Sequence, residues 1–292
     1  MTQKIVVQDR EWEREENRLK YCTELEKGNL LFFPEVPFDF PKNEIEFLLA
    51  QKQGSSKARK NIAYKPGLDR ITNHETKDPL EAEKLKGILR SYSNRVTTFL
   101  SSLLSPYAKY WRHDYASFRP FQEKGRGLRL RARNDLLHVD AFPTRPLHGA
   151  RILRFFTNIN PVENRVWNTS NSFEELLQQF GKEIPQSNYK ILRRLLRPLG
   201  MKWALRSPYD SFMLRFHNYL KENSAFQEQC SKKRWEFPPL SCWAVFTDQV
   251  SHAALQGQYA LEQTLIIPQK GLLTPEKSPL RLLEREFNKQ FV

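Results

Sequence analysis

Two blocks of strand-like sequence, divided by a helical block, constrain the fold of this chain more than any other feature. The first block spans residues 121–167 and the second spans residues 238–270. In the first block, Leu128, Leu130 and Ala132 alternate with arginines, a pattern that predicts a strand with one apolar and one cationic face. Because an insertion divides the strands, an antiparallel barrel or jelly roll fits better than a parallel βαβ sheet.

Helices are predicted in the regions around these blocks. Residues 1–120 are expected to form an N-terminal scaffold of helical and irregular structure. Within it, Asp78 and Pro79 begin a predicted helix with an apolar stripe, which Pro106 ends. The sequence therefore predicts one domain over residues 1–292, mainly β with α-helices.

The dividing block, residues 168–237, is predicted to be a helical insertion. Ser172 and Ser207 each begin a capping box, in which an acid follows three residues later. Between them, residues 189–199 are basic and amphipathic, with leucines on one face and Lys190, Arg193 and Arg194 on the other.

The charge of the chain restricts its partners. Among 292 residues, 47 are lysine or arginine and 33 are aspartate or glutamate, which gives a net charge of +14. A positive field of this size attracts nucleic acid, anionic membrane surfaces or acidic small substrates.

The chain has three widely spaced cysteines, no apolar run of the ~18–20 residues that a membrane span needs, and no secretory signal. We therefore expect a reducing, cytoplasmic setting. No GxGxxG or GxxxxGK[ST] motif points to a nucleotide fold.

His138 and Asp140 are the strongest candidates for chemistry. On a strand, side chains two residues apart point the same way, so an imidazole and a carboxylate could converge on one metal ion. A second histidine would complete a two-His-one-carboxylate set, which leaves positions on Fe(II) open for co-substrate and oxygen. His252 is the candidate, because it lies between two strand-like runs. His217, on the helix after Ser207, is expected to be structural.

An arginine could anchor the distal carboxylate of 2-oxoglutarate through two parallel hydrogen bonds. Arg154 follows Asp140 by fourteen residues and lies on the next predicted strand. Arg151 is the alternative, although its opposite parity directs it to the other face of the strand, where we expect a surface charge.

The runs HVDAFPTRPLHGARILRFFTNINP and WAVFTDQVSHAALQGQYALEQTLIIP resemble the Kdo hydroxylases, and LLFFPEVPF and KNIAYKP extend the likeness. These enzymes are Fe(II)- and 2-oxoglutarate-dependent dioxygenases that hydroxylate 3-deoxy-D-manno-oct-2-ulosonic acid (Kdo) in lipid A. The resemblance implies a double-stranded β-helix (jelly roll) with iron ligands at His138, Asp140 and His252. Many related enzymes carry the co-substrate arginine about ten residues after the distal histidine. Here the stretch LEQTLIIP has no cation, so the expected anchor is Arg154.

The resemblance also implies Fe(II), 2-oxoglutarate and O2 as cofactor and co-substrates, carbon 3 of Kdo as the target, and succinate and CO2 as co-products. Beyond the metal ligands we expect no further catalytic residue. The anions of Kdo-bearing lipid A would be bound by nearby arginines: Arg129, Arg131, Arg133 and Arg145. The basic segment 189–199 could contact an anionic membrane surface peripherally on the cytoplasmic face of the inner membrane, without spanning it.

Two other functions share some of these features. The first is a 2-oxoglutarate-dependent dioxygenase acting on another anionic substrate such as nucleic acid. It is disfavoured because no ordered aromatic and basic platform of the RRM type is present, and we expect no nucleic acid as partner. The second is a non-catalytic basic binding module in which His138 and Asp140 are incidental. The sequence does not predict the oligomeric state.

Overall fold

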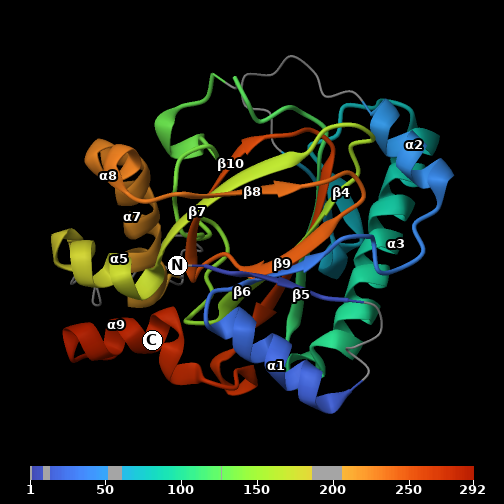
Figure 1. Ribbon diagram of the computed structural model, residues 1–292. Coiled ribbons are helices and arrows are strands. Elements are labelled where there is room, and N and C mark those ends of the chain that lie inside the picture. Colours follow the sequence, from blue (N-terminus) through green and yellow to red (C-terminus); the bar gives the residue numbers. More distant parts are fainter. Residues whose placement is uncertain (1, 9–13, 52–60, 126, 186–205) are drawn as a thin grey trace.

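A computed structural model describes residues 2–8, 14–51, 61–125, 127–185 and 206–292 (Figure 1). Its centre is a large sheet of eight strands in the order β1-β2-β9-β6-β11-β5-β3-β4. All neighbouring strands pair antiparallel except β1 and β2, which are parallel. The bounds are β1 Lys4–Val6, β2 Leu30–Phe33, β3 Ile62–Lys65, β4 Arg70–Thr72, β5 Arg112–Arg119, β6 Arg151–Asn158, β9 Cys242–Phe246 and β11 Ala260–Ile267.

A second, antiparallel sheet faces the first. It has the order β10-β7-β8, with β7 at Arg165–Ser172, β8 at Lys233–Phe237 and β10 at Val250–Gln256. Aromatic rings fill the space between the sheets: Trp243 stacks on Phe237 at 3.9 Å between ring centroids and on Phe156 at 5.1 Å. Two facing sheets, antiparallel except for the β1–β2 pair, pack around an apolar interior and confirm the jelly roll.

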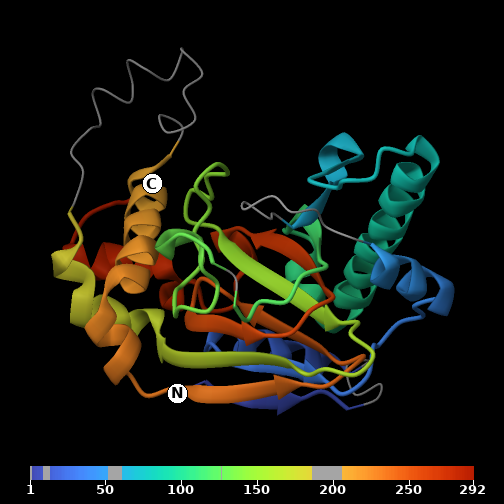
Figure 2. The same ribbon diagram turned by 90° about the horizontal axis from the view of Figure 1, so that it is seen from above.

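Helices cover the jelly roll on two sides, as Figure 2 shows from above. On one side lie α1 Glu15–Glu26, α2 Lys42–Ala50, α3 Pro79–Leu103 and the short α4 Ser105–Ala108. On the other lie α5 Phe173–Phe180, α7 Pro208–Glu222, α8 Ser224–Gln229 and α9 Pro279–Phe287. Within the described residues, no helix is both long and apolar enough to cross a membrane.

The capping signals are confirmed. The Asp78 carboxylate accepts a hydrogen bond from the Leu80 amide at the start of α3. Ser172 and Ser207 form complete capping boxes with Glu175 and Asp210 at the starts of α5 and α7. A buried stripe that includes Leu89, Val96 and Leu103 packs α3 against the large sheet.

Three sequence predictions need correction. Residues 128–133 do not form a strand, because a 3-10 helix spans Leu130–Ala132. Leu130 is 44% exposed, so the apolar residues of the alternating pattern do not form a buried face. Residues 1–120 are more than a scaffold, because they supply β1 to β5, and β5 pairs with β11 inside the large sheet. The block 168–237 is not entirely a helical insertion, since β7 continues to Ser172 and β8 begins at Lys233, and its described helices lie between these strands. The basic segment 189–199 lies outside the described residues.

Candidate metal and co-substrate site

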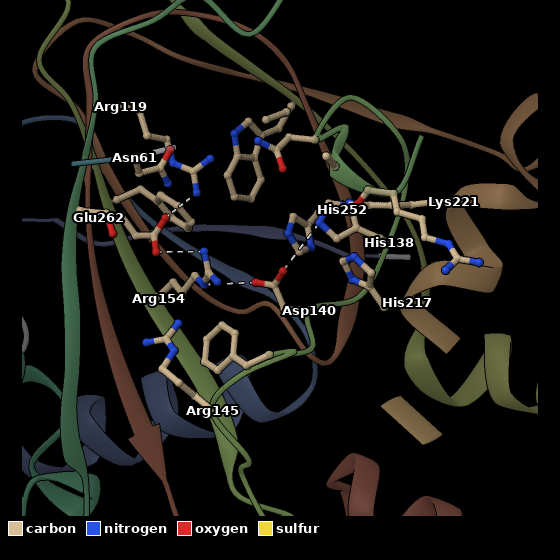
Figure 3. A pocket seen from close by; sticks show the side chains of 18 residues that line it. Asn61, Arg119, His138, Asp140, Arg145, Arg154, His217, Lys221, His252 and Glu262 are labelled. Carbon is tan, nitrogen blue, oxygen red and sulfur yellow. Dashed lines mark hydrogen bonds and ion pairs between the residues drawn. The ribbon is translucent and has the colours of Figure 1, made fainter. Parts of the chain in front are cut away.

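His138 and His252 lie side by side because their backbones pair. The His138 amide donates to the carbonyl of His252 (3.1 Å), and the His252 amide donates back (2.9 Å). The segment around His138 is a single bridge and not the predicted strand, whereas His252 lies within β10. The backbone of Asp140 is positioned by a hydrogen bond from its amide to the Thr247 carbonyl (2.8 Å). The two imidazole centroids are 4.7 Å apart, and His138 Nε2 is 3.6 Å from Asp140 Oδ1 (Figure 3).

A third imidazole enters the site from α7. The ring of His217 lies 4.8 Å from that of His138, edge to face. Potential ligand atoms of His138, Asp140 and His217 all lie within 4.8 Å of one another. The structure therefore places His217 in the site, where the sequence predicted only a structural role. It also leaves two histidines, His217 and His252, as candidates for the third ligand.

Backbone carbonyls fix the tautomer of all three histidines. Nδ1 lies 2.7 Å from Leu136 O in His138, 3.0 Å from Val250 O in His252 and 2.7 Å from Val139 O in His217. A carbonyl can only accept a hydrogen bond, so each Nδ1 carries the proton and each Nε2 keeps its lone pair. This arrangement is typical of histidines that bind metal through Nε2.

Burial and charge set the protonation states that a metal needs. Burial, helped by the charge of Lys221, lowers the pKa of His138 well below its usual value and that of His217 to about 4. Burial would raise the pKa of Asp140, but Arg154 and His138 outweigh it and hold that pKa well below its usual range. The site therefore offers neutral imidazoles and an ionised carboxylate.

A chain of alternating charges leads away from Asp140 along the cavity wall. Arg154 Nε lies 3.1 Å from Asp140 Oδ2, and Arg154 Nη1 donates to Glu262 at 2.9 Å. The other oxygen of Glu262 accepts from Arg119 Nη2 at 2.6 Å (Figure 3). Burial acts to raise the pKa of Glu262, but Arg154 and Arg119 outweigh it and lower the pKa. Both guanidinium groups are thereby held at the cavity by one buried carboxylate.

These charged residues surround a cavity of about 330 Å³. Its lining includes the three histidines, Asp140, the aromatic rings of Phe142, Phe156 and Trp167, and several polar side chains: Asn61, Ser117, Asn134, Arg119, Arg131, Arg145, Arg154, Lys221 and Glu262. Trp167 stacks on the His252 ring at 5.2 Å and 19°, which fixes the orientation of that imidazole.

Of the four arginines predicted to bind substrate anions, two line the cavity and two do not. Arg131 and Arg145 line the cavity, where Arg131 pairs with Glu222, and Arg145 pairs with Asp114 and lies 4.0 Å from the ring centroids of Tyr115 and Phe142. Arg129 and Arg133 are not among the lining residues, and Arg133 pairs with Asp135.

The prediction that Arg151 is a surface charge is wrong. Its side chain is 1% exposed, lies outside the lining of the cavity, and its Nε donates to the buried Asp248 at 2.8 Å. The prediction that opposite parity separates it from Arg154 is consistent with this placement.

Sequence reasoning missed Arg119, Glu262 and Lys221. Glu262 follows His252 by ten residues, near the position where many related enzymes carry the co-substrate arginine. The sequence feature that could have revealed this ion pair is the acidic residue on β11. Because β11 pairs with β5 near Arg119 and with β6 near Arg154, an acid on β11 can bind cations from both neighbouring strands.

Comparisons with known proteins show which family the chain resembles. The family described as 3-deoxy-D-manno-oct-2-ulosonic acid (Kdo) hydroxylase matches residues 8–290. A solved apo structure of the Kdo hydroxylase KdoO, described as a non-heme Fe(II) alphaketoglutarate dependent dioxygenase, is 36% identical with a TM-score of 0.89. The match covers 100% of this chain and 98% of that one. A structure of KdoO in complex with alphaketoglutarate and Fe(III) is 35% identical, with a TM-score of 0.88. This match also covers 100% of this chain and 98% of that one. The search of curated proteins found no match.

Proposed function

Because this chain belongs to the Kdo hydroxylase family, we propose that it hydroxylates carbon 3 of Kdo in Kdo-bearing lipid A. In the balanced reaction, 2-oxoglutarate and O2 are consumed, one oxygen atom enters the C–H bond of Kdo, and the other enters succinate as CO2 leaves. The observation that carries this proposal is the convergence of lone-pair Nε2 atoms and Asp140 in a cavity that also holds Arg154.

The donor set fits Fe(II). Imidazole and carboxylate together are the ligands of non-heme iron oxygenases. Asp140 Oδ2 accepts no hydrogen bond from the described residues, although the guanidinium of Arg154 lies 3.1 Å away as an ion pair. His138, Asp140 and His252 would hold the iron, which supplies the oxidising chemistry when it is bound with 2-oxoglutarate. We choose His252 over His217 because reciprocal backbone hydrogen bonds and the stacked Trp167 fix it beside His138.

Arg154 would bind the distal carboxylate of 2-oxoglutarate. Its guanidinium lines the cavity next to Asp140, and Glu262 holds it in place from the far side. A preformed, buried guanidinium recognises a carboxylate with little loss of side-chain entropy. Arg151 does not line the cavity and would stabilise the fold through Asp248.

Lipid A carries phosphates, and Arg131 and Arg145 at the cavity are the arginines placed to meet substrate anions. With a net charge of +14, the protein would also associate with an anionic membrane surface from one side. Co-sedimentation with vesicles containing anionic lipid tests this association, which should weaken as salt is raised. Binding that is insensitive to salt would refute it.

The activity is tested by incubating the protein with Fe(II), 2-oxoglutarate, O2 and Kdo-bearing lipid A. We expect a mass gain of one oxygen on the lipid, one succinate for each hydroxylation, and neither product after Asp140→Ala. An oligonucleotide offered in a parallel reaction should remain unmodified. Succinate formed without oxygen on Kdo, or an oxidised oligonucleotide, would assign the site to another substrate.

A further inference from the structure

Lys221 is a buried cation that the proposed mechanism leaves unused. It lies on α7, one turn after His217, and is 4% exposed. Its side chain lines the cavity, and its Nζ donates to the carbonyl of Arg131 at 3.1 Å. In the described part of the chain, no carboxylate forms an ion pair with it.

A buried ammonium without a counter-ion is energetically costly. Burial lowers the pKa of Lys221 to about 8, against the attraction of Asp140 and Asp135, so the amine is still mainly protonated at pH 7. The two cavity arginines on the other flank share Glu262 as their counter-ion. A charge kept in a cavity without a protein counter-ion is typical of a site whose counter-ion arrives with the ligand.

Its position separates Lys221 from the proposed 2-oxoglutarate anchor. In Figure 3, Lys221 lies on the α7 side of the histidine cluster, and Arg154 and Arg119 lie beyond Asp140 on the opposite side. The cavity therefore presents cations on two flanks of the candidate metal ligands. One flank serves the co-substrate in the proposed function, which leaves the other for an anion of the substrate.

Resting on the proposed function, we infer that Lys221 binds the C1 carboxylate of Kdo and so selects sugar acids over neutral sugars. In a 3-deoxy-2-ulosonic acid, the carboxylate carbon is bonded to C2, and C2 is bonded to C3. An ammonium that holds the carboxylate beside the histidine cluster therefore places C3 within reach of the same cluster. Lys221 is a binding residue and takes no part in proton or electron transfer.

The test compares a Kdo-bearing glycolipid with its methyl ester, in which the carboxylate charge is removed. Wild type, Lys221→Met, Lys221→Gln and the control Lys232→Met are assayed with both substrates. Lys232 is an exposed lysine outside the cavity whose Nζ also contacts a backbone carbonyl. Direct binding of both glycolipids is measured alongside turnover, and the KM for 2-oxoglutarate reports whether each variant is folded.

We expect wild type and Lys232→Met to prefer the acid over the ester by roughly tenfold or more in KM, the size of a charge-assisted hydrogen bond. Both Lys221 variants should lose this preference and keep the KM for 2-oxoglutarate. Variants that still discriminate, or that raise only the KM for 2-oxoglutarate, would overturn the inference while the proposed function stands. Wild type that binds the acid selectively but does not hydroxylate it would instead overturn the proposed function alone.

Discussion

At the residue scale, the roles of Arg154 and Arg151 are the clearest contrast in the structure. Both lie on β6, but only Arg154 reaches the cavity, and Arg151 is buried against Asp248. Arg154→Gln should raise the KM for 2-oxoglutarate at least tenfold, because a charge-assisted pair of hydrogen bonds is lost. Arg151→Gln should leave that KM unchanged and lower the melting temperature. Steady-state kinetics and thermal melts of both variants check this, and a larger KM change in Arg151→Gln would reverse the assignment.

Glu262 is the residue that holds the arginines. It is 4% exposed and bridges Arg119 and Arg154. Glu262→Gln removes the carboxylate that Arg154 and Arg119 share and leaves them only Asp140 and Glu123. This change should lower the free energy of unfolding by up to about 3–5 kcal/mol. Urea denaturation measures this. In the control Glu236→Gln, which removes an exposed pair with Arg234, the midpoint should not change. Equal midpoints for wild type and Glu262→Gln would show that the buried pair adds nothing.

At the element scale, one capping box fixes the start of α7, the helix that carries His217 and Lys221. Asp210 accepts hydrogen bonds from the amides of Ser207, Leu147 and His148, so it ties the start of α7 to the loop before β6. Asp210→Ala should cost about 3 kcal/mol because buried amides lose their acceptor. Ser172→Ala at α5 should cost only about 1 kcal/mol. Chemical denaturation of both variants checks the order, which the opposite ranking would contradict.

The sequence predicted the elements whose signals are local. The caps of α3, α5 and α7, and the strands β6, β9 and β11, follow from capping residues and apolar runs. The sequence-based prediction was wrong at Leu130–Ala132, where apolar and basic residues alternate on a segment that pairs with no strand. It also did not predict the pairing of β5 with β11, which is a long-range contact. The HxD pair and Arg154 could be found by spacing, whereas Arg119 and Lys221 enter the cavity only through tertiary packing.

At the scale of the whole molecule, the buried histidines make stability depend on pH. Burial lowers the pKa of His217 to about 4, and an unfolded histidine has a pKa of about 6.5. Between these values the unfolded chain binds a proton that the folded chain does not, so the free energy of unfolding falls as the pH drops from 6.5 to 4.

His217→Gln should remove part of this dependence, about 2 kcal/mol between pH 6.5 and 4.5. Urea denaturation of the metal-stripped protein at several pH values measures it, with the exposed His148→Gln as control. If His217→Gln and wild type lose stability in parallel over this range, His217 does not contribute to the acid sensitivity.

The proposed function requires a single iron bound by His138, Asp140 and His252 at the cavity. Anaerobic titration with Fe(II) in the presence of 2-oxoglutarate tests this directly in wild type, His138→Ala, His252→Ala and His217→Ala. We predict one iron per chain in wild type and His217→Ala, and binding at least tenfold weaker in His138→Ala and His252→Ala. Undiminished binding in His138→Ala would contradict the site, and loss in His217→Ala with retention in His252→Ala would replace its third ligand.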